Sequence, residues 1–163
     1  MPTPLLNPAA ENERLQLLLF EMPDRQEDFL EAAAAEGYHL DYTLATLPEL
    51  ERYLRDHAEA LAWRDKSASA VAGRLDCWSY IGETFRQNFG GGWNVSLTNP
   101  DSVLYGQFVL QDFSNNGLEF SPSNTLQAYL LRGKPSIRSM MEAHVHVAPV
   151  DLSDLPEEAD DAG

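Results

Sequence analysis

The clearest hydrophobic period in the chain lies in residues 68–89. Apolar and small residues recur there at steps of four and three positions: Val71, Leu75, Trp78, Gly82, Phe85 and Phe89. This spacing places side chains on one stripe of an α-helix. Three glycines at 90–92 end the helix, because glycine readily adopts the left-handed conformation found at helix ends. Residues 93–97 alternate between large apolar and polar side chains, which predicts a strand.

A glycine stands inside this predicted helix, at position 82. Glycine in a helix interior costs about 1 kcal/mol relative to alanine. We therefore expect the backbone of another segment to pass close to Gly82. The pattern predicts a core at the point where this helix turns into the sheet.

Cap and breaker residues predict three helices before this segment. Asn7 followed by proline begins the first, and Pro23 ends it. Asp24 with Glu27 has the spacing of a capping box, which opens a second helix over 25–36. Thr46 with Glu49 has the same spacing and opens a third. The apolar and ring-bearing residues of this third helix are Leu47, Leu50, Tyr53, Leu54, His57 and Leu61.

After residue 97 the pattern predicts more strands and then short helices. Residues 98–102 form a turn, 103–113 a second strand, and the Asn116-Gly117 step a hairpin that leads to a third strand at 118–120. Helices are expected at 125–132, with Asn124 as its cap, and at 137–144. The predicted fold is α+β: N-terminal helices, a long central helix packed on a small antiparallel β-meander, and short C-terminal helices. Residues 1–150 form one domain, and the acidic residues 151–163 form a solvated tail.

The net charge of the chain limits the classes of partner that it can bind. The 163 residues carry 26 acids against 11 lysines and arginines, a formal net charge of −15. Such a surface repels nucleic acid and anionic membranes, and it attracts a basic protein. The alternative is that the charge serves solubility alone.

Composition also bears on the compartment. A single cysteine, Cys77, excludes an intramolecular disulfide and fits a reducing compartment. The N-terminal segment has no basic stretch followed by an apolar run, so no secretory signal is expected. The longest apolar run, residues 17–20, is too short to span a bilayer. We therefore expect a cytoplasmic protein.

Motifs for catalysis are missing from the sequence. The glycines at 90–92 follow a helix, whereas a phosphate-binding loop precedes one. His144 and His146 lie on one face if their segment is extended, but two ligands do not make a zinc site. Glu83 has Arg86 three residues later, which favours a surface ion pair over a structural carboxylate or a catalyst. We expect no enzyme activity, no metal and no cofactor; the alternative is a small metal- or ligand-binding enzyme using Glu83, His144 and His146.

Three segments carry a resemblance. They are the run LDYTLATL at 40–47, the helix YIGETFR at 80–86, and the GGGW turn at 90–93. They resemble the "LDYS…SL", "Y-x-GE-x-x-R" and "GG-x-W" patterns of a loosely defined group of small uncharacterised bacterial proteins, with Thr43 in place of serine. A proline-led helix after Pro122 completes the match, which spans roughly 29–140.

This group resembles the immunity proteins of bacterial toxin systems. The resemblance implies a non-catalytic protein that binds a cognate toxin, expected to be basic, and occludes its active site. A constitutive adaptor protein is the other alternative. The expected contacts are polar loop residues and the acids of the tail: Asn99, Asp101, Asn115, Asn116, Asp151, Asp154, Glu157 and Glu158.

Overall fold

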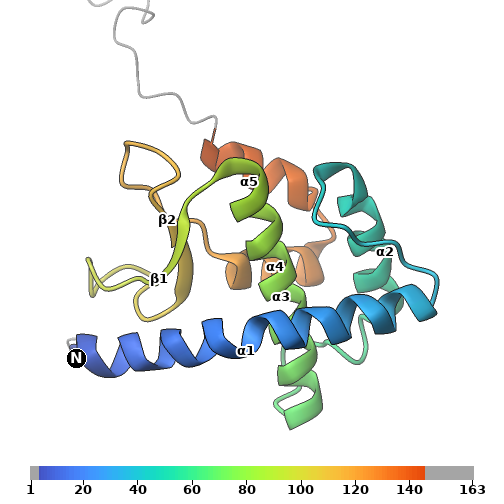
Figure 1. Cartoon of the computed structure of the whole chain (residues 1–163), viewed down its shortest axis with the longest axis horizontal. Coiled ribbons are helices and arrows are strands. Elements are labelled where there is room, and N and C mark those ends of the chain that lie inside the picture. Colours follow the sequence, from blue (N-terminus) through green and yellow to red (C-terminus); the bar gives the residue numbers. More distant parts are fainter. Residues whose placement is uncertain (1–3, 146–163) are drawn as a thin grey trace, which may run out of the picture.

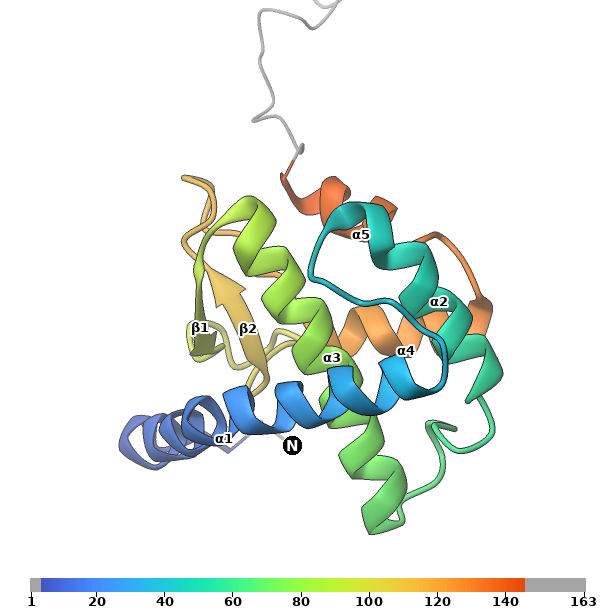
Figure 2. The ribbon, with the colours of Figure 1, turned by 45° about the vertical axis from the view of Figure 1, so that its right-hand side comes forward.

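The computed structural model of the chain describes residues 4–145. Within this range the elements follow in the order α1 (Pro8–Ala35), η1 (Leu44–Thr46), α2 (Leu47–Asp56), α3 (Ala68–Phe89), β1 (Gly92–Val95), β2 (Phe108–Gln111), α4 (Pro122–Arg132) and α5 (Ile137–Val145). Figures 1 and 2 show α1 crossing α3, with the β1–β2 hairpin at one side of the crossing and α2 at the other. The α+β prediction with a long central helix on a small antiparallel sheet is confirmed. The predicted tail, 151–163, lies outside the described residues.

The central helix has the predicted limits. The Ser67 hydroxyl accepts a hydrogen bond from the backbone N–H of Ala70, and Gly90 closes the helix with φ +90°. The predicted apolar stripe is only partly right, because Val71 at its start is 47% exposed. The fully buried side chains form a wider face than one stripe, since α1, α4 and the hairpin all pack on α3. That face includes Cys77, Tyr80, Ile81 and Phe85.

The prediction that Pro23 ends the first helix is wrong. One helix, α1, continues through Pro23 to Ala35, and Asn7 caps its start as predicted. Proline inside a helix removes one backbone hydrogen bond. The helix continues because one buried stripe runs along both of its halves: Leu15, Met22, Gln26, Phe29 and Ala33. Figure 2 shows α1 changing direction partway along, as proline-containing helices do.

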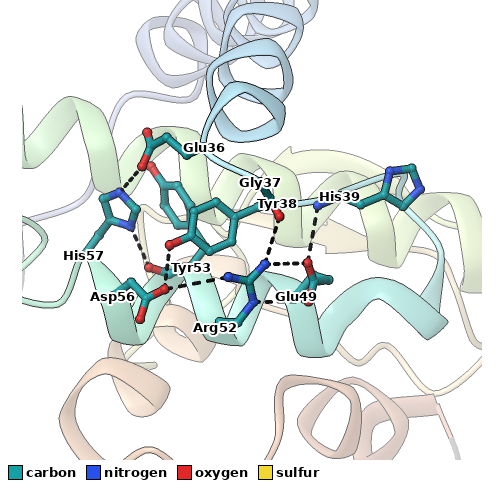
Figure 3. A network of polar contacts seen from close by, with 9 residues as sticks. All are labelled: Glu36, Gly37, Tyr38, His39, Glu49, Arg52, Tyr53, Asp56 and His57. Atoms are coloured by element: carbon teal, nitrogen blue, oxygen red, sulfur yellow. Dashed lines mark hydrogen bonds and ion pairs between the residues drawn. The ribbon is translucent and has the colours of Figure 1, made fainter.

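A polar network holds α2 against the C-terminal end of α1 (Figure 3). Arg52 donates to the Gly37 carbonyl at 2.9 Å and lies over the Tyr38 ring. His57 stacks on Tyr53, and its Nε2 lies 2.9 Å from the Glu36 carboxylate. The third predicted helix is shorter than expected, because α2 ends at Asp56 and Leu61 lies in the turns that follow.

The sheet is smaller than predicted. β1 and β2 pair antiparallel with Gly92 opposite Gln111, and residues 118–120 add only the bridge between Leu110 and Phe120. Residues 102–105 form turns, as in the hydrogen bond that the Tyr105 N–H donates to the Ser102 carbonyl, so the strand begins only at Phe108. After the sheet, α4 begins at Pro122 with Ser121 as its cap instead of Asn124, and α5 lies within one residue of its predicted limits.

Gly82 is the point where the sheet meets the central helix. A Cβ at this position would lie 2.1 Å from the indole ring of Trp93 on β1 and 3.0 Å from Pro122. The expectation that the backbone of another segment passes close to Gly82 is therefore wrong, because the atoms that fill this space belong to the side chains of Trp93 and Pro122. The missing side chain of residue 82 lets the indole lie directly against the helix.

We expect Gly82→Ala to lower the free energy of unfolding by about 1–3 kcal/mol, because the added methyl forces the Trp93 ring away from α3. Urea unfolding followed by circular dichroism measures the change. Gly73→Ala in the same helix is the matched control. A Cβ there meets only the end of the Leu61 side chain, at 2.9 Å, and alanine favours the helix. Equal losses in the two variants would contradict the assigned role of Gly82.

Candidate functional site

A cleft lies between α1, α3 and β1. Its volume is about 510 Å³, within the range of ligand-binding clefts. Helix α1 supplies one wall, with Leu19, Met22, Pro23, Gln26, Glu27 and Leu30. The other wall and the floor come from Tyr42, Glu83, Arg86, Gln87 and Trp93. The cleft is mainly apolar, with its polar groups on the floor and at the rim.

Glu83 is the centre of the polar floor. Arg86 donates to both of its carboxylate oxygens, at 2.8 and 3.0 Å, and the indole N–H of Trp93 donates to it at 2.7 Å. Burial alone would raise the pKa of the Glu83 carboxyl, but these donors outweigh burial and the pKa is lowered. The group is therefore a fixed carboxylate with its acceptors in use. The predicted ion pair with Arg86 is present, and the carboxylate also holds the sheet to the helix.

Tyr42 forms the other part of the floor in an unusual backbone conformation. Its φ is +65°, which is uncommon for a large side chain. Its N–H donates to the Tyr80 hydroxyl at 3.0 Å, and Asn88 donates to its carbonyl at 2.8 Å. Burial, followed by the nearby Glu83 charge, raises the pKa of the Tyr42 hydroxyl to about 12. That hydroxyl donates to Gln26 on α1 at 3.1 Å and so joins the two walls.

The turn that carries Tyr42 is tied by Asp41. One carboxylate oxygen of Asp41 accepts from the Thr43 backbone N–H, the Thr43 hydroxyl and the Thr46 hydroxyl, at 2.6–3.0 Å. Thr46 does not cap α2 with its side chain, so the predicted capping box is absent. The Thr46 hydroxyl donates to Asp41 instead of capping the helix. The Thr43 hydroxyl, and then the others, lower the pKa of Asp41 from 3.8 to about 2.

The three segments that carried the resemblance meet at this cleft. Tyr42 from the first segment stacks on Tyr80 from the second, with ring centres 4.8 Å apart. Trp93 from the third segment contacts Gly82 and Glu83 from the second. Residues up to about fifty positions apart in sequence therefore form one floor. The side chains of these segments contact one another and so hold the three segments together.

The solvent face of α1 borders the same cleft. Its exposed residues follow four- and three-residue steps opposite the buried stripe, and we call them the α1 stripe: Glu13, Leu17, Phe20, Asp24, Glu27 and Glu31. Phe20 is 82% exposed and Leu17 is 58% exposed. The two arginines of α1, Arg14 and Arg25, pair with Glu11 and Asp76 instead. Glu27 belongs both to the stripe and to the cleft wall.

The predicted loop contacts lie at two separate places. Asn99 and Asp101 lie in the loop before β2, where the Asn99 side chain accepts from the Asp101 N–H. Asn115 and Asn116 lie in the loop after β2, at the other end of the strand, and both are exposed. The structure therefore does not bring the two loops into one surface. The tail acids Asp151, Asp154, Glu157 and Glu158 lie outside the described residues.

The residues of the alternative enzyme site do not converge as described. Glu83 lines the α1–α3 cleft, whereas His144 lies against Phe120 in a separate pocket that includes Glu119. His146 lies outside the described residues. Between residues 4 and 145, no three His, Cys, Asp or Glu side chains are grouped so that they could hold a metal ion. Cys77 is fully buried, and burial raises the pKa of its thiol.

Comparison with known families, curated proteins and solved structures found no match to this chain. In the described part of the chain, no helix has the length and apolar character needed to cross a bilayer.

Two polar groups of the cleft are occupied by contacts within the protein. The Glu83 carboxylate and the Tyr42 hydroxyl are both engaged by protein partners. The rest of the accessible cleft surface consists mainly of apolar side chains and the exposed Glu27 carboxylate at the rim. The sequence prediction divided this helix at Pro23 and so missed the α1 stripe. The four- and three-residue spacing of the stripe residues from Glu13 to Glu31 was the available signal.

We expect Glu83→Ala to destabilise the protein by about 1–3 kcal/mol, because it leaves the Trp93 N–H and Arg86 without their acceptor. Arg86→Ala is the matched variant. It should cost less, since Glu83 keeps its bond from Trp93 and the Arg86 side chain is 42% exposed. Thermal unfolding and tryptophan emission of both variants measure the difference. A larger loss for Arg86→Ala would contradict the role given to Glu83.

The lowered pKa of Asp41 predicts a pH dependence. A carboxyl whose pKa is lower in the folded protein stabilises the fold above its unfolded pKa, and this contribution is lost as pH falls from about 4 toward 2. The stability difference between wild type and Asp41→Asn should therefore shrink mainly between pH 4 and pH 2. Urea unfolding at several pH values tests this prediction. Asp28→Asn, at an exposed position of α1, is the control for the removal of one negative charge. A difference that stays constant with pH would refute the assignment.

Proposed function

We propose that this protein is a non-catalytic binding protein that neutralises a basic partner protein, as immunity proteins neutralise their cognate toxins. The α1 stripe is the observation that carries the proposal. It places an exposed aromatic ring and an exposed leucine among four acids on one helix face. The resemblance of the cleft-forming segments to immunity-type proteins supports the choice of a toxin as the partner.

The stripe has the composition of a protein-binding surface for a cationic partner. Aromatic side chains supply much of the binding energy in protein interfaces, and Phe20 is available for that role. Acids around it speed association with a basic surface and disfavour acidic proteins. The net charge of −15 extends the same field over the whole chain.

The surface-loop residues remain a second proposed contact. Asn99 and Asp101 are exposed, and so are Asn115 and Asn116 at the other end of β2. One partner that covers both loops must extend along the hairpin. The α1 stripe is favoured as the main contact because it combines charge with exposed apolar side chains.

The proposal is tested by co-purification of the tagged protein with the products of its neighbouring genes. We expect an equimolar complex with a basic protein that is toxic when expressed alone. In that complex, the double variant Asp24→Lys/Glu31→Lys should raise the dissociation constant about tenfold or more, because it places cations against a cationic partner. Surface plasmon resonance at two salt concentrations measures the effect, which should be smaller at high salt.

Glu59→Lys/Asp101→Lys changes the net charge by the same amount away from α1, and it tests the proposed loop contact at Asp101. If this variant weakens binding and the α1 variant does not, the contact belongs to the hairpin loop. If neither variant changes the affinity, the electrostatic proposal fails. If no basic partner is captured and no toxic neighbour exists, neutralisation of a toxin is excluded.

A further inference from the structure

We propose that the α1–α3 cleft is the receptor for one large apolar side chain of the basic partner, aromatic or aliphatic. Arginine or lysine side chains beside it in the same segment would pair with Glu27 and the other acids of the α1 stripe. This inference rests on the proposed function, and it names the chemistry of the segment that the site recognises.

The walls of the cleft select an apolar group. Leu19, Met22 and Leu30 come from one side and the Trp93 indole from the other. The Glu83 carboxylate already accepts from Trp93 and Arg86, and the Tyr42 hydroxyl already donates to Gln26. A polar group placed against these engaged side chains and the apolar wall would lose water with little gained in return. An apolar side chain has no such cost.

The rim selects the charge of the neighbouring residues. Glu27 lines the cleft and is exposed, and Asp24 and Glu31 lie one turn before and after it on the same face. A cationic side chain beside the apolar anchor therefore meets carboxylates. The Glu83–Arg86 pair on the floor is neutral as a unit and does not oppose it.

The same charges argue against other occupants. A second copy of this chain carries the same net charge of −15, and an anionic membrane is repelled by the α1 stripe. A segment of a basic protein satisfies both the apolar walls and the acidic rim. The cleft also continues directly into the proposed binding face through Glu27.

Two synthetic peptides probe the inference on the full-length protein. Both consist of arginine and serine, and one of them has a central phenylalanine where the other has serine. We expect the phenylalanine peptide to bind wild type about tenfold more tightly, because only it buries an apolar side chain in the cleft. Fluorescence anisotropy of labelled peptides gives both dissociation constants. The peptides contain no tryptophan, so a change in protein emission reports on the indole groups, including Trp93.

A cleft-filling variant locates the effect. Gln87 lies at the cleft and is exposed, so Gln87→Trp should fill the opening without disturbing the core. We expect it to reduce the advantage of the phenylalanine peptide to less than about threefold, whereas Gln87→Ala retains the full advantage. Thermal unfolding checks that both variants remain folded.

The outcomes separate this inference from the proposed function. Asp24→Lys/Glu31→Lys should weaken both peptides by a similar factor and leave their ratio unchanged. Equal binding of the two peptides to wild type, or no effect of a folded Gln87→Trp variant, overturns the apolar receptor and leaves the acidic face standing. If the lysine variant does not change peptide binding, the acidic face itself fails. If wild type binds neither peptide, both ideas fail.

Discussion

The contact between Trp93 and Gly82 is the constraint on which the rest of the structure depends. The indole occupies the space that a side chain at position 82 would fill, and its N–H is fixed by Glu83 on the next position of α3. This contact sets the distance and orientation of β1 on the central helix. Because β2 pairs with β1 and bridges to Phe120, the contact also sets the position of the chain that leads into α4.

The same contact forms one wall of the cleft, and α1 forms the other. The proline in α1 carries no penalty large enough to break the helix, because a buried stripe on either side of it packs on the body of the protein. Continuation through Pro23 places acids from both halves of α1 on one solvent face. A divided helix would have left these acids on two unrelated surfaces. The acidic solvent face of α1 is therefore a consequence of packing on the opposite side of the helix.

The cleft combines a rigid floor with an open rim. Glu83, Arg86 and Tyr42 are held by hydrogen bonds within the protein, and the left-handed backbone of Tyr42 is held by Tyr80 and Asn88. Groups held in this way keep the floor of the cleft in one shape. The negative charge lies at the exposed rim, where Glu27 borders the cleft.

The sequence by itself determined the elements with strong local signals. The cap at Asn7, the glycines after Phe89 and the periodicity of residues 68–89 set the helix limits, because these signals act within one or a few turns of chain. Tertiary structure decided whether Pro23 ends a helix, how short the strands are, and that the Thr46 hydroxyl serves Asp41. Those outcomes depend on partners far away in sequence. The cleft, assembled from α1, Tyr42, Glu83 and Trp93, exists only through such long-range contacts.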